Sequence, residues 1–259
     1  MDLGLDKQIV FVAGSSRGIG KAIAATLLQE GASVVLTGRD EASLHAAEAE
    51  LAATAGQERI LAIDGDFADS ATIARAFEQT VQRFGRIDHL IANLGTGNGK
   101  PGWDQTEEEW GRLFEVNFFA STRLAQAVVP LLLANVGGGS ILFISSIVAI
   151  EATAAPLPYS AAKAALVNYS KNLARMLGPK KIRVNTIAPG NIFFAGGSWE
   201  QHLNARREAV EAILEHEVPQ QRFGTPEEIA SLAAYLCSPQ AAFATGACYV
   251  MDGGQTRSL

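Results

Sequence analysis

The sequence predicts an α/β protein with a doubly wound, seven-stranded parallel sheet covered by helices on both faces. The alternation of short and long segments along the chain supports this fold class. Short apolar runs rich in β-branched residues alternate with longer helical patterns along the whole chain, and repeated strand–helix units of this length form parallel sheets. The chain has 259 residues, 48% of them hydrophobic, which is enough for one large core. We therefore expect a single domain over residues 1–259.

Seven segments have the length and composition of buried strands. They are Gln8 to Ala13, Ser33 to Thr37, Arg59 to Ile63, His89 to Ala92, Ser140 to Ile144, Arg183 to Ile187 and Cys248 to Met251. Residues 190 to 222 depart from the regular alternation. We expect them to form a substrate lid over about residues 191–222.

Two helix starts carry the capping-box pattern, a hydroxyl residue followed three positions later by a glutamate. Thr106 precedes Glu109 in this way, and Thr225 precedes Glu228. The second start also has Pro226 at the first helical position, where proline is favoured.

The first strand runs directly into a glycine-rich turn, Gly14 to Gly20, and an alanine-rich helix follows. Glycines permit positive φ angles and close backbone approach, and the amino end of a helix offers free N–H groups. Strand, turn and helix together predict a dinucleotide-binding turn. The spacing, G-x-x-x-G-x-G, is a variant of G-x-G-x-x-G, and an ordinary tight turn is the alternative.

Composition and charge exclude several functions. The formal net charge is −6 and the longest run of like charge is Glu107–Glu109, which argues against nucleic-acid binding. We find neither a signal peptide nor an apolar stretch as long as a membrane span, so we expect a cytoplasmic protein without a membrane partner. Cys237 and Cys248 are too few and isolated for a disulfide framework or a thiolate metal site. We expect no metal.

The candidate for chemistry is the stretch from Ser145 to Lys163. Ser146 ends a strand, and Tyr159 and Lys163 lie four residues apart on one face of the following helix. An ammonium beside a phenol lowers the phenol pKa from about 10, because it favours the phenolate. Tyr159 is therefore a candidate general acid/base, with the Ser146 hydroxyl on the same substrate oxygen. Without further context, such a pair would more often lie on the surface.

The end of the second strand predicts which nicotinamide cofactor is used. An NAD enzyme of this fold usually has an acidic residue there, which binds the ribose. Here Gly38 takes that place, Arg39 follows, and Arg17 of the glycine turn lies on the same side. Two guanidinium groups can clamp a 2′-phosphate, so NADP(H) is favoured over NAD(H), unless Arg39 is only a solvated loop cation. We expect Asp40 to cap the next helix.

From Lys7 to Gly254 the chain resembles the short-chain dehydrogenase/reductase family. The motifs in order are Gly14 to Gly20, Asp66, Ala92-Asn93-Leu94-Gly95, Asn117, Ser146, Tyr159, Lys163, Pro189-Gly190 and Asp252-Gly253-Gly254. The resemblance implies a Rossmann fold and a catalytic set of Asn117, Ser146, Tyr159 and Lys163. In this family the tyrosine protonates a carbonyl oxygen as hydride leaves the nicotinamide, and the lysine holds the nicotinamide ribose. The asparagine kinks its helix and anchors a water in a proton relay.

The glycine turn and the resemblance together assign a set of residues to the cofactor. These residues are Gly14, Ser16, Arg17, Gly18, Ile19, Gly20, Arg39, Asp66, Asn93, Gly95, Tyr159, Lys163, Pro189, Gly190 and Ile192. Ala92, Leu94 and Ala13 depart from the family pattern. Phe194 replaces the threonine that usually follows Pro-Gly, which puts one side-chain contact to the cofactor in question.

The substrate is less well defined. The commonest bacterial members of the family reduce 3-oxoacyl groups on an acidic carrier protein, and they tend to carry basic residues before the strand of the catalytic serine. Residues 135–139 contain no base, and an acidic protein attracts an acidic partner weakly. We therefore favour a small ketone or secondary alcohol, with 3-oxoacyl-carrier-protein reductase as the alternative. Phe193, Phe194 and Trp199 indicate an apolar or flat substrate, or packing of the lid onto the core.

A non-catalytic dinucleotide-binding sensor or scaffold is an alternative of another class, although such proteins usually lose the tyrosine or lysine. The helices expected at 106–134 and 159–177 are apolar on more than one side, which predicts that their outer faces are covered. The apolar residues are Leu124, Val128, Val129, Leu131, Leu132, Ala161, Ala165, Leu166, Tyr169 and Leu173. In the family these helices form a dimer interface and tetramers are common, so we expect a symmetric homo-oligomer, a homotetramer.

Overall fold

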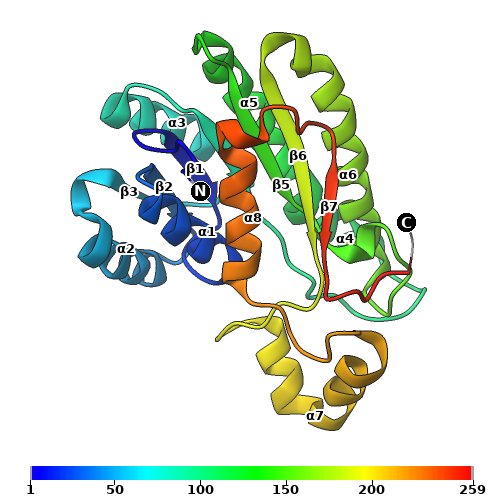
Figure 1. The fold of residues 1–259 in the computed structure, drawn as a ribbon. Coiled ribbons are helices and arrows are strands. Elements are labelled where there is room, and N and C mark those ends of the chain that lie inside the picture. The colour runs from blue at the N-terminus through cyan, green and yellow to red at the C-terminus, as the bar shows by residue number, and fades with distance from the viewer. Residues whose placement is uncertain (1, 258–259) are drawn as a thin grey trace.

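The computed structural model describes residues 2–257, which contain a seven-stranded sheet in the order β3-β2-β1-β4-β5-β6-β7 (Figure 1). The strands are β1 (Ile9–Ala13), β2 (Ser33–Gly38), β3 (Ile60–Asp64), β4 (His89–Ala92), β5 (Gly139–Ile144), β6 (Ile182–Pro189) and β7 (Cys248–Met251). All neighbouring strands pair in parallel. The doubly wound Rossmann fold with seven parallel strands is confirmed.

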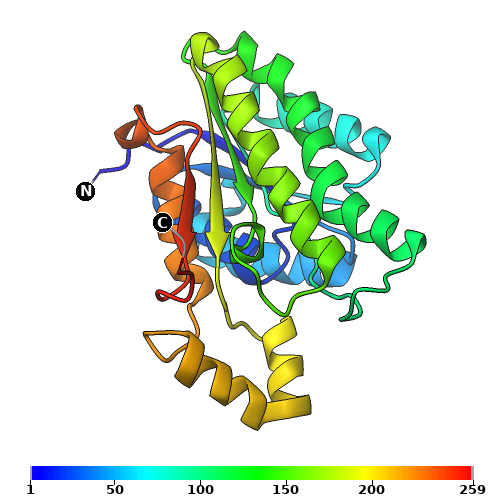
Figure 2. The same ribbon diagram turned by 90° about the vertical axis from the view of Figure 1, so that its right-hand side faces the viewer.

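Helices cover both faces of the sheet. They are α1 (Gly18–Gln29), α2 (Glu41–Ala55), α3 (Ser70–Phe84), α4 (Glu107–Phe114), α5 (Ala120–Ala134), α6 (Leu157–Leu177), α7 (Ser198–Glu217) and α8 (Pro226–Cys237). Alternate side chains of β1 show the two layers: Val10 and Val12 pack with α1, α2 and α8, whereas Phe11 packs with α3, α5 and α6. Figure 2 shows α8 and α6 on opposite sides of β6 and β7.

The strand order reverses at β1, which lies between β2 and β4. In open α/β sheets the ligand crevice forms at such a switch point, outside the carboxyl ends of the strands. The glycine turn follows β1 directly and the segment that begins at Asn93 follows β4. The fold therefore places these two segments at the expected crevice.

The two predicted capping boxes have different outcomes. Thr225 and Glu228 form a complete box at the start of α8, as expected. At the start of α4, Thr106 accepts a hydrogen bond from the Glu109 N–H at 3.2 Å, but the Glu109 carboxylate pairs with Arg112 at 2.7 Å. The first box is therefore only half formed, because a nearby guanidinium is the stronger partner for the carboxylate.

The chain from Glu107 to Ala134 is one helical run that includes a π-turn at Glu115–Phe119. An 18-residue window of it has a mean hydropathy of 1.3 and is 44% buried, so by length and composition alone it reaches the size of a membrane span. The expectation that no stretch is this long and apolar is therefore wrong. Leu124, Val128 and Leu132 pack against the sheet, which accounts for the apolar character of α5.

The segment expected as a lid consists of α7 and the chain on either side of it, and α7 projects beyond the carboxyl ends of the strands (Figure 1). Its base is closed by the bridge between Ile192 and Gly224. Helix α7 is interrupted at Arg206, where the backbone is not helical. Val210 is its one fully buried residue, so this helix is packed thinly against the rest of the protein.

Candidate active site

Hydrogen bonds to two neighbouring strands hold the glycine turn. The Gly14 N–H donates to Thr37 Oγ1 at 3.0 Å, and Asn93 Nδ2 donates to the Gly14 carbonyl at 2.9 Å. A Cβ on Gly20 would lie 2.1 Å from that carbonyl, so a larger residue does not fit. Gly14 and Gly18 have φ angles of 69° and 55°, which favour glycine. This closely packed backbone at the amino end of α1 suits a pyrophosphate.

Ser16, Gly38 and Arg39 meet where β2 ends. A Cβ on Gly38 would lie 3.3 Å from Ser16 Oγ, so the serine occupies the space beside this position. Arg39 is exposed. Asp40 accepts a hydrogen bond from the Ser43 N–H at 2.8 Å, and hydrogen bonding by Ser43 lowers the Asp40 pKa. The prediction that Asp40 caps its helix is confirmed.

Two other residues predicted to bind the cofactor, Arg17 and Asp66, make their hydrogen bonds outside this cluster. Arg17 Nη1 donates to the carbonyl of Gly196 in the lid at 3.2 Å, so its guanidinium is engaged there. Asp66 is exposed and accepts a hydrogen bond from the Ala68 N–H at 3.1 Å. The loop that carries Asp66 begins with Gly65, which donates to the Gly38 carbonyl at 3.0 Å.

Ser146 follows the carboxyl end of β5, and its hydroxyl lies close enough to that of Tyr159 to influence the tyrosine pKa. Tyr159 is half-buried, and desolvation by the surrounding protein raises its pKa, while the hydrogen bond from Ser146 acts in the opposite direction. The expectation that a neighbouring ammonium lowers the pKa of Tyr159 is therefore wrong for this structure. Desolvation dominates, because it favours the neutral phenol.

The contacts of Lys163 explain why its ammonium does not lower the pKa of Tyr159. Its Nζ donates to the backbone carbonyl of Ile144 at 2.9 Å and to that of Leu94 at 3.4 Å. The side chain is only 3% exposed, and burial lowers the pKa of Lys163 to about 8. The amine is thus anchored to the ends of β4 and β5 and loses its proton more easily than an exposed lysine.

Asn117 lies in the π-turn between α4 and α5 and is fully buried. Its Oδ1 accepts from the Thr96 N–H at 3.0 Å, and its Nδ2 donates to the carbonyls of Thr96 and Leu113, both at 3.0 Å. A Cβ on Gly95 would lie 2.8 Å from Asn117 Oδ1 and 2.9 Å from Lys163 Nζ. Glycine at position 95 therefore lets Asn117 and Lys163 approach the same piece of backbone.

Pro189 and Gly190 end β6 beside the chain that follows β7. The Gly190 N–H donates to the Met251 carbonyl at 2.9 Å, and a Cβ on Gly190 would lie 2.7 Å from Asp252 Cβ. Ile192 is buried next to this contact, at the base of the lid. The Pro-Gly and Asp-Gly-Gly motifs thus fix the point from which the lid begins.

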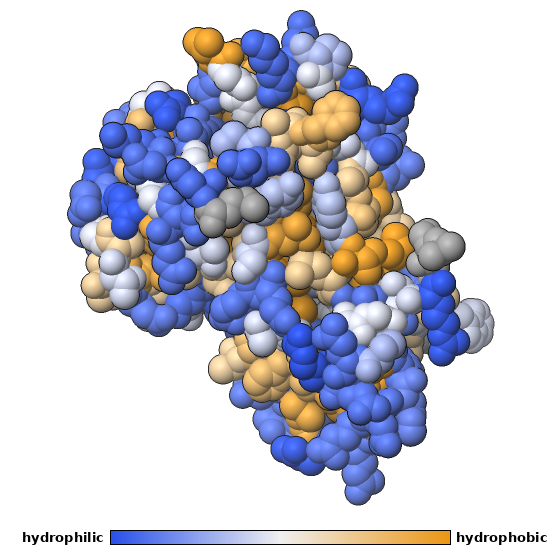
Figure 3. Space-filling model, viewed as in Figure 1, coloured by the Kyte–Doolittle hydropathy of each residue, from blue (hydrophilic) through white to orange (hydrophobic). Residues whose placement is uncertain are grey.

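The three lid aromatics have different neighbours. The rings of Phe193 and Trp199 lie 5.6 Å and 5.3 Å from that of Phe223, so they pack the two ends of the lid together. The ring of Phe194 lies instead on Gly18 of the glycine turn. Figure 3 shows apolar side chains exposed on the lid and along its boundary with the rest of the molecule.

The sequence did not single out two positions beside the catalytic set. Buried Ser145 donates its hydroxyl to the Lys163 carbonyl at 3.1 Å, which fixes α6 to β5. A Cβ on Gly97 would lie 3.7 Å from the Tyr159 ring, so the segment after β4 passes beside the tyrosine. The Ser-Ser pair was visible in the sequence, but only the fold shows which serine faces which way.

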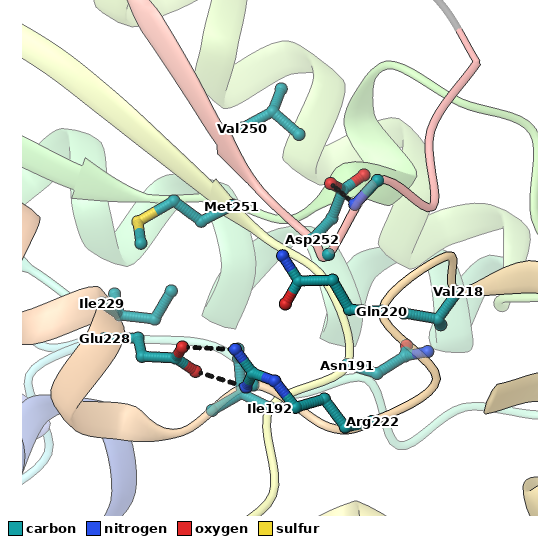
Figure 4. Close-up of a pocket in the computed structure, with 13 residues that line it drawn as sticks. Asn191, Ile192, Val218, Gln220, Arg222, Glu228, Ile229, Val250, Met251 and Asp252 are labelled. Carbon is teal, nitrogen blue, oxygen red and sulfur yellow. Dashed lines mark hydrogen bonds and ion pairs between the residues drawn. The ribbon is translucent and has the colours of Figure 1, made fainter.

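A cavity of about 320 Å³ lies on the other side of β6, between the base of the lid and α8 (Figure 4). An ion pair between Arg222 and Glu228 at 2.7 Å forms part of its wall, and this pairing lowers the pKa of Glu228 to about 2. Ile192 is the predicted cofactor residue among its lining residues. Within residues 2–257 no group of three His, Cys, Asp or Glu side chains is placed to hold a metal ion.

Comparison with known proteins shows which family the chain belongs to. The family model described as enoyl-(acyl carrier protein) reductase matches residues 13–256. Dehydrogenase/reductase SDR family member 4 of Bos taurus is 35% identical, over 98% of this chain and 89% of that protein. The chain belongs to the short-chain dehydrogenase/reductase family.

Two solved structures are similar over their full length. L-sorbose reductase from Gluconobacter frateurii, complexed with NADPH and L-sorbose, has a TM-score of 0.90 and 33% identity, with both chains covered completely. A 7α-hydroxysteroid dehydrogenase complexed with NADH and 7-oxo glycochenodeoxycholic acid also has a TM-score of 0.90, with 32% identity over 100% of this chain and 98% of that chain. The family thus binds nicotinamide dinucleotides of both kinds.

Proposed function

We propose that this protein is an NADP(H)-dependent oxidoreductase that interconverts a ketone and a secondary alcohol on a small substrate, with Tyr159 as general acid/base. The observation that carries the proposal is the position of Ser146 beside the Tyr159 hydroxyl at the end of β5, with buried Lys163 on the same helix as the tyrosine. Raised and lowered pKa values on neighbouring groups are typical of acid/base sites.

Each side chain has a defined task in this proposal. Tyr159 is neutral at physiological pH, since its pKa is raised further above an ordinary value of 10.0, and it donates its proton to the carbonyl oxygen. Ser146 holds the same oxygen, since its hydroxyl already meets that of the tyrosine. Lys163, with a pKa of about 8, can exchange a proton near neutral pH. When bound, the nicotinamide supplies or accepts the hydride.

The cofactor preference depends on the residues of this chain, because one similar structure contains NADPH and the other NADH. Gly38 replaces the acidic residue that would bind the ribose and repel a 2′-phosphate. Asp40 is occupied as a helix cap, and Arg39 is exposed beside it. These three features support NADP(H) and, with NADPH as the usual reductant, reduction as the physiological direction.

A small ketone or secondary alcohol is the proposed substrate class. L-sorbose and a 7-oxo steroid acid are bound in the two similar structures, so this scaffold accepts both polar and apolar carbonyl compounds. The matching family model carries the name of an enzyme that acts on acyl carrier protein, and an acyl thioester is therefore included as a test substrate. The absence of a base at residues 135–139 favours the free small molecule.

The decisive experiment is a turnover panel with NADPH and NADH. It should contain a keto sugar, a 7-oxo steroid, an aliphatic ketone, a 3-oxoacyl thioester and a trans-2-enoyl thioester, with Tyr159→Phe as the control for each. Reduction of a free ketone that is lost in the control supports the proposal. Cofactor binding without turnover of any substrate would favour a sensor or scaffold, and reduction of only a thioester would favour the carrier-protein alternative.

We also propose that the protein is a cytoplasmic homotetramer. Exposed apolar side chains on α4, the π-turn, α5 and α6 support the assembly: Trp110, Phe119 and Leu133 are partly exposed, and Met176 is 72% exposed. Light scattering at micromolar concentration tests it, and a monomeric mass would contradict it.

A further inference from the structure

Phe194 lies on the cofactor-binding turn. A Cβ built on Gly18 would be 2.7 Å from two carbon atoms of the Phe194 ring, so the ring rests directly on this glycine. Gly18 is the first residue of α1, and no side chain caps that end of the helix. The ring therefore covers a part of the turn where backbone N–H groups are free to bind an anion.

A second contact joins the same two segments. Arg17, next to Gly18, donates its Nη1 to the Gly196 carbonyl at 3.2 Å. The Gly197 N–H donates to the Phe194 carbonyl at 3.0 Å, and a Cβ on Gly197 would lie 3.0 Å from the Phe194 ring. Residues 194–197 thus form a tight turn that contacts the glycine turn through both a ring and a carbonyl.

Both contacts use groups that a dinucleotide needs. A pyrophosphate binds at the amino end of the first helix in this fold, and it cannot share the space above Gly18 with a phenyl ring. Arg17 is one of the two guanidinium groups expected at the 2′-phosphate, but its Nη1 is held by the lid. Val210 is the only fully buried residue of α7, so little other packing holds this helix in place.

The geometry points to a latch: Phe194 and Arg17 hold the lid over the glycine turn, and the cofactor must displace them in order to bind. The pyrophosphate displaces the ring, and the 2′-phosphate draws Arg17 away from Gly196. Cofactor binding and lid release are therefore coupled, and the energy of the latch reduces cofactor affinity. The part of this inference that concerns the cofactor rests on the proposed function.

Cofactor titration of Phe194→Ala tests the competition. This variant removes the ring from Gly18 and should bind both NADPH and NADH about five- to tenfold more tightly, within the usual range of such couplings. Phe193→Ala is the matched control, since it removes a neighbouring lid ring that packs on Phe223, and its affinity should change much less. Unchanged or weaker binding by Phe194→Ala, or equal tightening in both variants, would overturn the latch.

Arg17→Ala separates the two cofactors, because Arg17 serves both the lid and, in this proposal, the 2′-phosphate. NADH has no such phosphate, so its binding should become slightly tighter when the tether to Gly196 is lost. NADPH binding should become weaker. A parallel change for both cofactors would overturn the shared role of Arg17.

Limited trypsin digestion without any cofactor tests the latch independently of the proposed function. Arg206 and Arg207 lie at the bend of α7, and cleavage there should be faster in Phe194→Ala and Arg17→Ala than in the wild type and Phe193→Ala. Equal cleavage rates would overturn the latch even if cofactor binds. Faster cleavage in the two variants, with no cofactor binding by any form of the protein, would refute the proposed function and the competition between the lid and the cofactor. It would still support the contact between the lid and the glycine turn.

Discussion

His89 should make the protein sensitive to acid. It is buried at the start of β4, and its Nδ1 lies 2.8 Å from Ser140 Oγ on β5. Burial, and to a smaller extent the charge of Arg183, lowers the pKa of the imidazole from 6.5 to about 3. The neutral ring is therefore the form that fits the fold. The perturbation that tests this is His89→Gln, which retains a polar side chain but does not titrate.

The sign and size of the effect follow from the two pKa values. Between pH 6.5 and about pH 3 the unfolded chain binds a proton at His89 and the folded protein does not. Stabilisation by the neutral ring is thus complete above pH 6.5 and is lost as the pH falls toward 3. Each pH unit changes the free energy of unfolding by at most about 1.4 kcal/mol, so the limit over the whole window is about 5 kcal/mol.

Urea unfolding at several pH values, at one fixed protein concentration, measures this dependence. Between about pH 6.5 and pH 5 the wild type should lose up to about 2 kcal/mol more than His89→Gln. The control is His45→Gln, because His45 is exposed and a hydrogen bond to Glu48 raises its pKa instead. Parallel losses of stability in the wild type and His89→Gln would refute the reasoning.

Three further changes test the proposed chemistry. Tyr159→Phe removes the proton donor and should lower kcat by about two to four orders of magnitude while cofactor Kd hardly changes; substantial residual activity would contradict it. Arg39→Ala should weaken NADPH binding by about one to two orders of magnitude and leave NADH binding nearly unchanged, since a hydrogen bond to a charged group is worth about 1.5–3 kcal/mol. An equal loss of affinity for both cofactors would argue against a contact between Arg39 and the 2′-phosphate. Because burial lowers the Lys163 pKa to about 8, kcat/KM for reduction should fall as the pH rises through that value, and the fall should move to higher pH in Lys163→Arg. An unmoved profile would assign the ionisation to another group.

The sheet was predictable because its strands are parallel and five of them, β1, β2, β4, β5 and β6, are buried on both faces. Such strands read as nearly continuous apolar runs, and β1 is buried at every one of its five positions. Their alternation with helices then indicated the fold class. The strand boundaries in the structure differ from the predicted ones by only one or two residues. The capping pattern at Thr106 was less reliable, because Arg112, one turn along, takes the carboxylate of Glu109. A capping pattern in the sequence does not show whether the carboxylate of Glu109 will bind the backbone at Thr106 or the guanidinium of Arg112.

The electrostatics of the site were harder to predict than its residues. The sequence places Lys163 four positions after Tyr159, which correctly puts them on one helix. It does not show that the carbonyls of Ile144 and Leu94 bind the amine. Nor does it show that desolvation dominates the tyrosine pKa. The sequence also did not predict that the Arg17 guanidinium binds the lid. Its partner there, the Gly196 carbonyl, is 179 residues away in the chain.

The segment that follows β4, residues 93–97, links the glycine turn to three of the four proposed catalytic residues. Asn93 binds the glycine turn through the Gly14 carbonyl, and the next carbonyl, that of Leu94, accepts from Lys163. Thr96 is bound on both its N–H and its carbonyl by Asn117, and Gly97 lies beside the Tyr159 ring. A change at any one of these contacts therefore moves the backbone that the others share. This explains physically why an asparagine is needed in the π-turn: its amide positions the segment against which the lysine and tyrosine are both placed.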